Sequence, residues 1–222
     1  MFAKLRLTCR DAVGWLVYKI VRFLLLAIVK VKRVNLQVVG TERLPKRGAY
    51  VLALVPHTSF VDGPLIIMAV RRRFIGMGMA ELLDWKEWHV ISLLFRLMGH
   101  IPVQRDNPKS RKEAFEAGIA TIRRGVPVFI SPPGRIRNPE ERDVWRNGYA
   151  RMSIETGTPM ALVRVFGAKA FMDEGPEGEW IFDWSQPMAV IIGAVLDPND
   201  FTSADELDAE AQRIYETIRP PD

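Results

Sequence analysis

One run of seven apolar residues, 49–55, limits the folds open to this chain more than any other feature. It is bounded by Gly48 and Pro56, residue types that end regular structure. Because the run does not alternate with polar residues, it predicts a strand buried on both faces, as in a parallel sheet. Similar short runs follow at 101–104, 126–130, 160–165, 180–184 and 188–196.

Longer segments with helical spacing separate these runs. Residues 84–98 and 110–124 predict helices, and Asn107 or Ser110 is available to cap the second. Residues 203–218 predict a C-terminal helix, in which Ser203 and Glu206 form a capping box. This alternation is typical of βαβ units, so we predict an α/β fold with a mainly parallel or mixed sheet flanked by helices.

Composition narrows the class of protein. With 222 residues, 48 % of them hydrophobic, the chain can bury a sizeable core. The single cysteine, Cys9, excludes an internal disulfide or a cysteine cluster for a metal, and we expect no metal site. The net charge of +5 favours a negatively charged partner. No helix-turn-helix, zinc finger or aromatic–basic RNA platform is present, so we expect a membrane or a phosphorylated substrate and no nucleic acid.

The N-terminal segment indicates that a membrane is one such negatively charged partner. Residues 12–34 are apolar but interrupted by five basic side chains, and the longest uncharged run, 23–29, is too short to span a bilayer. We therefore predict that 1–34 form an amphipathic, membrane-associating helix and that 35–222 form the main domain. Basic side chains would reach lipid headgroups while Trp15 and Phe23 enter the acyl boundary. The alternative is a helix that covers the core of the domain itself.

The first candidate for chemistry is His57-Thr-Ser-Phe-Val-Asp62, directly after the predicted strand 49–55. In an open α/β sheet, ligands bind at the carboxyl ends of the strands. Five residues are about 1.4 helical turns, so Asp62 can reach back to His57 if a helix begins between them. Asp62 would then fix the tautomer of the imidazole and leave Nε2 as a base.

The same spacing permits a structural interpretation, in which His57 forms a hydrogen bond within the loop and Asp62 caps the next helix. No serine nucleophile elbow of the Gly-x-Ser-x-Gly type occurs. The catalytic interpretation therefore predicts direct attack by an acceptor hydroxyl on an acyl thioester. His89 and His100 are expected to be packing or boundary residues.

Several blocks together resemble the glycerophospholipid acyltransferase family, which includes lysophosphatidic acid acyltransferases. They are His57-x4-Asp62, Glu81-Leu82, Gly-His-Ile-Pro-Val-Gln-Arg at 99–105, Pro132-x-Gly134 and Gly-Thr-Pro at 157–159. The resemblance implies that His57 is the base, that Asp62 is its partner, and that Arg105 binds the phosphate of the acceptor. It also implies a donor thioester on coenzyme A or acyl carrier protein and no further cofactor.

The predicted acceptor loop is where the chain departs from the family. The usual block resembles Phe-Pro-Glu-Gly-Thr-Arg-Ser, whereas here Pro133 stands at the position of the glutamate and Ile136 at that of the arginine. Pro132, Pro133 and Gly134 are expected to form this loop, with Pro133 and Gly134 at the centre of a type II turn. Arg135 and Arg137 are further candidates for binding phosphate, because a guanidinium grips phosphate through two parallel hydrogen bonds.

These features predict an enzyme on the cytoplasmic face of a membrane, held there peripherally or monotopically. It would move a fatty acyl group to a hydroxyl of a lysophospholipid or a glycerol phosphate-like acceptor. The alternative is a slow or non-catalytic lipid-binding relative with the same fold, which the departure at Pro133 keeps open.

Overall fold

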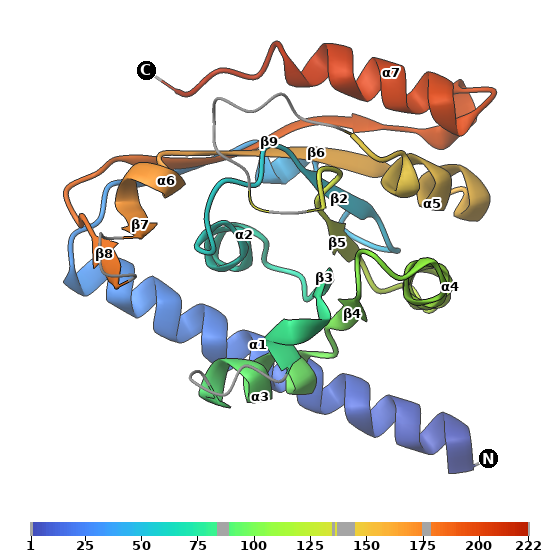
Figure 1. Cartoon of the computed structure of the whole chain (residues 1–222), viewed down its shortest axis with the longest axis horizontal. Coiled ribbons are helices and arrows are strands. Elements are labelled where there is room, and N and C mark those ends of the chain that lie inside the picture. The colour runs from blue at the N-terminus through green and yellow to red at the C-terminus, as the bar shows by residue number, and fades with distance from the viewer. Residues whose placement is uncertain (1, 84–88, 135, 137–144, 175–178, 222) are drawn as a thin grey trace.

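The computed structural model describes residues 2–83, 89–134, 136, 145–174 and 179–221, and for 2–10 and 174 the backbone alone. Seven helices and nine strands lie in these ranges (Figure 1). The helices are α1 (Phe2–Val31), α2 (Asp62–Ala69), α3 (His89–Met98), α4 (Pro108–Arg123), α5 (Gly148–Thr156), α6 (Ala168–Phe171) and α7 (Ala204–Tyr215). The strands are β1 (Leu36–Val39), β2 (Val51–Leu54), β3 (Ile75–Met79), β4 (Ile101–Val103), β5 (Val128–Ile130), β6 (Met160–Phe166), β7 (Met172–Glu174), β8 (Trp180–Phe182) and β9 (Met188–Leu196).

The main sheet has seven strands in the order β1-β9-β6-β2-β5-β3-β4. Strands β2 to β6 are parallel to one another. Strand β9 is antiparallel to β6, and β1 pairs with β9 in parallel. The predicted α/β class with a mixed sheet is therefore confirmed. Strands β7 and β8 form a separate antiparallel pair, which we call the β7–β8 ribbon.

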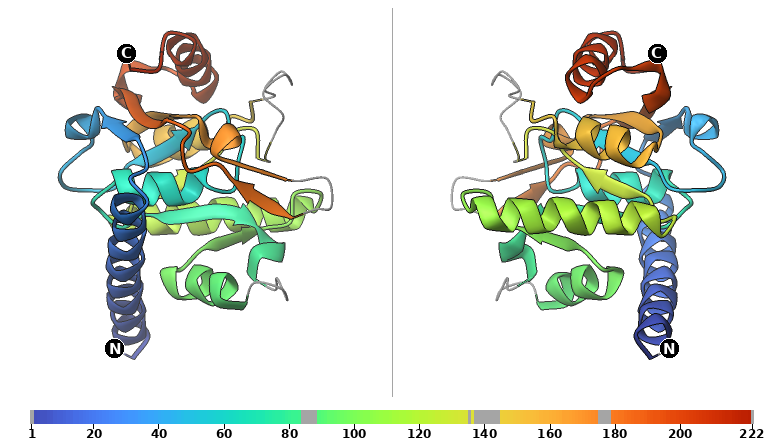
Figure 2. Two further views of the ribbon diagram at one scale, coloured as in Figure 1. Left: turned by 90° about the vertical axis from the view of Figure 1, so that its left-hand side faces the viewer. Right: turned by 90° about the vertical axis from the view of Figure 1, so that its right-hand side faces the viewer.

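Helices cover both faces of this sheet (Figures 1 and 2). On one face, α1 and α2 enclose a hydrophobic cluster with β2, β6 and β9. On the other face, α4, α5 and α7 enclose a second cluster with the same central strands. Helix α3 packs against α1 at the edge that carries β4.

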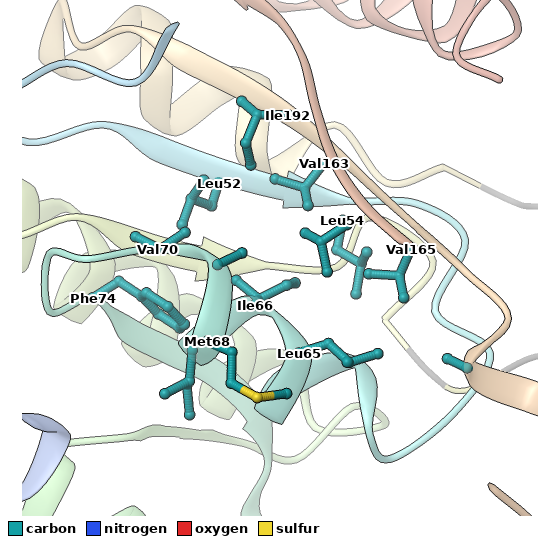
Figure 3. Packing of buried hydrophobic residues seen from close by; sticks show 14 of the residues in the cluster. Leu52, Leu54, Leu65, Ile66, Met68, Val70, Phe74, Val163, Val165 and Ile192 are labelled. Atoms are coloured by element: carbon teal, nitrogen blue, oxygen red, sulfur yellow. The ribbon is translucent and has the colours of Figure 1, made fainter. Parts of the chain in front are cut away.

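Strand β2 is the centre of the fold. All four of its side chains are buried, as the apolar run predicted, because the sheet continues on both sides and helices cover both faces. Figure 3 shows Leu52 and Leu54 facing Ile66 and Leu65 of α2, with Val163 of β6 beside them. The strand therefore fixes both α2 and the loop that joins them.

The two sides of helix α1 differ in their surroundings. One stripe, including Gly14 and Tyr18, is buried against the domain, with Val21, Leu25 and Val29 packed beside it. The opposite side exposes large apolar side chains, among them Trp15, Leu16, Ile20, Phe23 and Leu24. By length and composition, Asp11–Val31 is also able to cross a membrane, and only 11 % of its most apolar window is buried in the protein.

Helix boundaries follow capping side chains. Helix α4 begins at Pro108, two residues before the predicted start, because Asn107 accepts hydrogen bonds from the N–H groups of Lys109 and Ser110. Helix α7 begins after Ser203, whose hydroxyl accepts from the N–H of Glu206 as predicted. The other half of the predicted capping box differs, because the Glu206 carboxylate accepts from the N–H of Thr202 instead of that of Ser203. The predicted helix at 84–98 is confirmed from His89 onward, and its first five residues lie outside the described part of the chain.

Candidate active site

The carboxyl ends of five parallel strands meet at one edge of the sheet. Four of the five family blocks identified in the sequence place a residue just beyond one of these strands, whereas the Gly-Thr-Pro block at 157–159 precedes β6 and lies at the opposite edge. His57 lies beyond β2, Glu81 beyond β3, Arg105 beyond β4, and the Pro132–Pro133 turn beyond β5. Blocks separated by up to 75 positions therefore reach the same edge, which is where open α/β sheets bind ligands.

His57 and Asp62 are in direct contact, as the catalytic interpretation predicted. The distance between His57 Nδ1 and Asp62 Oδ2 is 2.8 Å. The same carboxylate oxygen accepts hydrogen bonds from the backbone N–H groups of Thr58, at 2.9 Å, and Ser59, at 3.1 Å. Two backbone N–H groups and the imidazole nitrogen thus meet at one oxygen and close the six-residue loop onto itself.

The surroundings of the two side chains differ. The Asp62 side chain is fully buried, whereas the His57 side chain is 22 % exposed. Asp62 is also the first residue of α2, where the N-terminus of a helix stabilises a negative charge. Its second oxygen, Oδ1, is buried and has no hydrogen-bond partner within the described chain. A buried carboxylate thus holds an imidazole whose far edge faces solvent.

The capping interpretation of Asp62 is wrong. Val61 occupies the N-cap position of α2, and no side chain caps it. The carboxylate instead accepts from Thr58 and Ser59, which precede the helix. The Asp62 carboxylate therefore forms hydrogen bonds with the loop backbone and contacts the imidazole.

The β7–β8 ribbon holds the other side of this loop. The ring of Phe60 packs edge to face on Trp180 of β8, with centroids 5.3 Å apart. The hydroxyl of Ser59 lies 3.5 Å from the carbonyl oxygen of Met172, the first residue of β7. Sequence reasoning missed both contacts, because nothing in the local pattern links residues more than 110 positions apart.

The predicted acceptor loop is a turn, but its register differs by one residue. Gly134 N–H donates to the carbonyl of Ser131, so Pro132 and Pro133 occupy the two central positions. The prediction placed Pro133 and Gly134 there. Gly134 is the fourth residue and has a φ of 71°, a conformation that costs glycine little. Both prolines are buried, and β5 places this turn beside the His57 loop, since β5 and β2 are neighbours.

The predicted phosphate ligands are only partly described. Arg105 lies half-buried in the turn between β4 and α4, and its carbonyl accepts a hydrogen bond from Arg111. Strands β2 and β4 are three positions apart in the sheet, so this turn begins about 14 Å from the His57 loop. Arg135 and Arg137 lie outside the described residues.

The two remaining histidines do not belong to the site. His89 is exposed at the start of α3. His100 precedes β4 at the opposite end of the strand, where its ring packs on Phe95 and beside Gly76 and Gly78. Burial lowers the pKa of His100 to about 4, so its ring is neutral at physiological pH. The prediction that both are packing or boundary residues is confirmed.

A cavity of about 530 Å³ lies between β4 and α4, and His57 is not part of its lining. Within the described residues, no group of three or more His, Cys, Asp or Glu side chains is placed to hold a metal ion.

The chain is similar to known proteins. A family model described as Acyltransferase matches residues 35–165, the part of the chain that carries every block named above. The chain is 23 % identical over 143 residues to the 1-acyl-sn-glycerol-3-phosphate acyltransferase BAT2, chloroplastic, of Brassica napus, which covers 63 % of this chain and 39 % of the relative. It is 24 % identical over 138 residues to a 1-acyl-sn-glycerol-3-phosphate acyltransferase of Borreliella burgdorferi, covering 62 % and 54 %.

The fold also has a solved counterpart. The 1-acyl-sn-glycerophosphate (LPA) acyltransferase PlsC of Thermotoga maritima superposes with a TM-score of 0.67 at 20 % identity, over 90 % of this chain and 78 % of that one. This chain spans about two fifths to half of the length of the curated relatives named above. The matching model covers more than half of the chain and includes the His57–Asp62 pair, so the protein belongs to the acyltransferase family.

Proposed function

We propose that this protein is an O-acyltransferase that moves a fatty acyl group from a thioester to a hydroxyl of a lysophospholipid or a glycerol phosphate-like acceptor. The observation that supports this most is the 2.8 Å contact between His57 Nδ1 and Asp62 Oδ2 at the carboxyl edge of the sheet. Family membership and the names of the relatives, which act on 1-acyl-sn-glycerol-3-phosphate, point to the same chemistry.

The pair sets the tautomer of the imidazole. An ionised carboxylate can only accept hydrogen bonds, so the proton shared with Asp62 is carried by His57 Nδ1. His57 Nε2 then has a free lone pair, which is what a general base requires. Because Asp62 is buried and already accepts two backbone N–H groups, it orients the ring and stabilises the imidazolium that forms during the reaction.

The transfer then needs no covalent enzyme intermediate. His57 Nε2 takes the proton of the acceptor hydroxyl as the oxygen attacks the thioester carbonyl carbon. A carbon–oxygen bond forms, the tetrahedral intermediate collapses, and the carbon–sulfur bond breaks. The imidazolium returns its proton to the sulfur, which leaves as a free thiol. General base catalysis of this kind contributes about 10²- to 10⁴-fold in rate.

In this proposal Arg105, Arg135 and Arg137 bind the phosphate of the acceptor, and the turn at Pro132, Pro133 and Gly134 shapes its entry. The Pro132–Pro133 turn follows β5, the strand next to β2. Arg105 lies in the turn after β4, which is three positions from β2 in the sheet. An acceptor held by Arg105 must therefore extend across about 14 Å of the sheet edge to present its hydroxyl to His57. The donor is a thioester of coenzyme A or of acyl carrier protein.

The proposal includes attachment to the cytoplasmic face of a membrane through α1. The outward side of this helix exposes apolar side chains between Lys19, Arg22 and Lys30, a pattern that suits the boundary between headgroups and acyl chains. One stripe of its side chains packs on the domain, so we propose attachment through the outward side, either peripheral or monotopic.

Thiol release tests the function. Purified protein is supplied with acyl-CoA or acylated carrier protein, each with lysophosphatidic acid, glycerol 3-phosphate or a monoacylglycerol. We expect acceptor-dependent release of free thiol, greater with the phosphorylated acceptors. His57→Gln should reduce it about 10²- to 10⁴-fold, while His89→Gln, an exposed histidine outside the site, should not. Lipid binding without turnover for any pair would instead support the slow or non-catalytic alternative.

A further inference from the structure

Large apolar side chains are exposed on three elements, not on α1 alone. Phe23 on α1 is 70 % exposed and Val90 on α3 is 71 % exposed. Leu93 and Leu97 also lie on the outer side of α3, and Ile181, Phe182 and Trp184 are exposed on or just after β8. Single exposed apolar residues are common, but many large ones on a few elements indicate a surface that binds a partner.

Contacts link the three elements. Helices α1 and α3 pack against each other, and the segments that follow α1 and β8 also meet. The ammonium group of Lys32, just beyond α1, lies 5.3 Å from the centre of the Trp184 ring. Arg73 joins the helices, since its guanidinium donates to the side chain of Asp11 at 3.0 Å and to the carbonyl of Met98 at 3.0 Å.

The charged side chains beside these apolar residues indicate which kind of partner binds them. Lys19 and Lys30 are exposed among the apolar residues of α1, and Lys32 and Arg33 follow its last turn. Apolar side chains bordered by lysine and arginine match an anionic bilayer, in which acyl chains lie beneath negative headgroups. A tryptophan beside a lysine, as at Trp184 and Lys32, suits the headgroup level of such a bilayer.

We infer that the membrane-binding surface comprises α1, α3 and the β7–β8 ribbon together, and that its partner is an anionic lipid bilayer. This inference rests on the proposed membrane association and extends it to two further elements. The ribbon also holds the loop of His57, through Trp180 on Phe60 and Met172 near Ser59. A bilayer that contacts Ile181 and Trp184 is therefore in contact with the element that positions the candidate base.

Site-specific dyes distinguish this surface from α1 alone. In a Cys9→Ser background, Phe23→Cys, Leu93→Cys and Ile181→Cys each receive an environment-sensitive dye, one position per element. Ala209→Cys is the matched control, because Ala209 is exposed on α7, across the sheet from α1. With vesicles of phosphatidylglycerol and phosphatidylcholine, emission should shift to shorter wavelength at the first three positions and stay unchanged at Ala209.

Vesicle affinity provides a second readout. Burying an exposed leucine side chain in an apolar medium is worth about 1.5 to 3 kcal/mol, so Leu93→Ser should weaken vesicle binding about tenfold or more. Ala209→Ser should leave it unchanged.

Other outcomes would overturn the inference. A shift at Phe23 without one at Leu93 and Ile181 would restrict binding to α1. No shift anywhere would also remove the proposed membrane association, whereas thiol release with soluble substrates would still report the proposed chemistry separately. Shifted emission before vesicles are added, together with the mass of a dimer in sedimentation, would assign the surface to a second copy of the chain.

Discussion

At the scale of single residues, the site depends on one oxygen atom. Asp62 Oδ2 accepts hydrogen bonds from the imidazole of His57 and from two backbone N–H groups. The negative charge matters more than the shape of the side chain, because it must stabilise a positive imidazolium while the acceptor oxygen attacks.

Asp62→Asn tests this role of the charge. Asparagine keeps the size of the side chain but is neutral, and its amide can also donate a hydrogen bond to His57 Nδ1 and so place the ring proton on Nε2. We expect kcat to fall about 10²-fold or more, with a smaller change in KM. Asp200→Asn, at an exposed carboxylate far along the chain, is the control and should behave as the unchanged protein. A variant that keeps full turnover would rule out an electrostatic role for Asp62.

His100 gives a second prediction, on stability. Burial lowers its pKa from 6.5 to about 4, so the unfolded chain binds a proton at a higher pH than the folded protein does. The stabilisation is complete above pH 6.5 and is lost as the pH falls through about 4. Over this window the loss amounts to up to about 3 kcal/mol.

Urea unfolding at several pH values between 4 and 7 measures the effect. The free energy of unfolding should decline toward acid, and His100→Gln should flatten the decline over this window, because glutamine does not titrate. An equal slope in both proteins would assign the acid sensitivity to other groups.

At the scale of elements, helix α1 is fixed to the domain where Gly14 meets Arg73. A Cβ atom at position 14 would lie 2.5 Å from the guanidinium nitrogen Nη2 of Arg73. Arg73 cannot move away freely, because it is buried and holds Asp11 and Met98. The close approach of α1 therefore requires glycine here, in the middle of a helix.

Gly14→Ala separates packing from helix propensity. Alanine in a helix interior is favoured over glycine by about 1 kcal/mol, so a purely local effect would stabilise the protein. We expect the reverse, a loss of thermal stability, because the Arg73 contacts must shift. Gly148→Ala in α5, where a Cβ would meet nothing within 4 Å, is the matched control and should be neutral or stabilising. A more stable Gly14→Ala protein would show that α1 does not pack as described.

Sequence patterns predicted some elements better than others, for physical reasons. The run at 49–55 predicted β2 because a strand buried on both faces needs apolar side chains throughout. Strand β3 was not predicted, since its sequence Ile-Gly-Met-Gly-Met has two glycines. In the fold, these glycines make room for the ring of His100, whose atoms would lie 2.9 to 3.3 Å from added Cβ atoms. That requirement comes from tertiary contact and leaves no local pattern.

The contacts of the candidate site were also predicted only in part. His57 and Asp62 are five residues apart, so local geometry was enough to predict their contact, and the structure confirms it. The support that Trp180 and Met172 give to Phe60 and Ser59 depends on how the chain returns after β6, which spacing does not encode. The register of the Pro132–Pro133 turn was wrong by one residue because either proline suits its first central position.

At the scale of the whole molecule, α1 belongs to both the core and the outer surface. Tyr18 is buried, and its hydroxyl donates to the carbonyl of Val70 at 2.7 Å, which ties α1 to the end of α2. Its neighbours Leu16 and Ile20 point outward. In our proposal, stability and membrane binding thus depend on different faces of one helix.

Tyr18→Phe and Leu16→Gln test this division. Loss of the Tyr18 hydrogen bond should lower the free energy of unfolding by about 1 kcal/mol, measured with urea in the absence of lipid. Leu16→Gln is an exposed substitution and should change stability by no more than about 0.5 kcal/mol while weakening vesicle binding. Equal destabilisation by both would mean that the outward face is covered by protein.

The central claim is that Asp62 acts through the imidazole of His57, and a double-mutant cycle on kcat tests it most directly. Thiol release is measured for the unchanged protein, His57→Gln, Asp62→Asn and the combined variant, all at saturating donor and acceptor. Once the base is removed, its partner has nothing left to orient, so the combined variant should be no slower than His57→Gln. Losses that multiply would show that the two side chains act independently and would contradict the account.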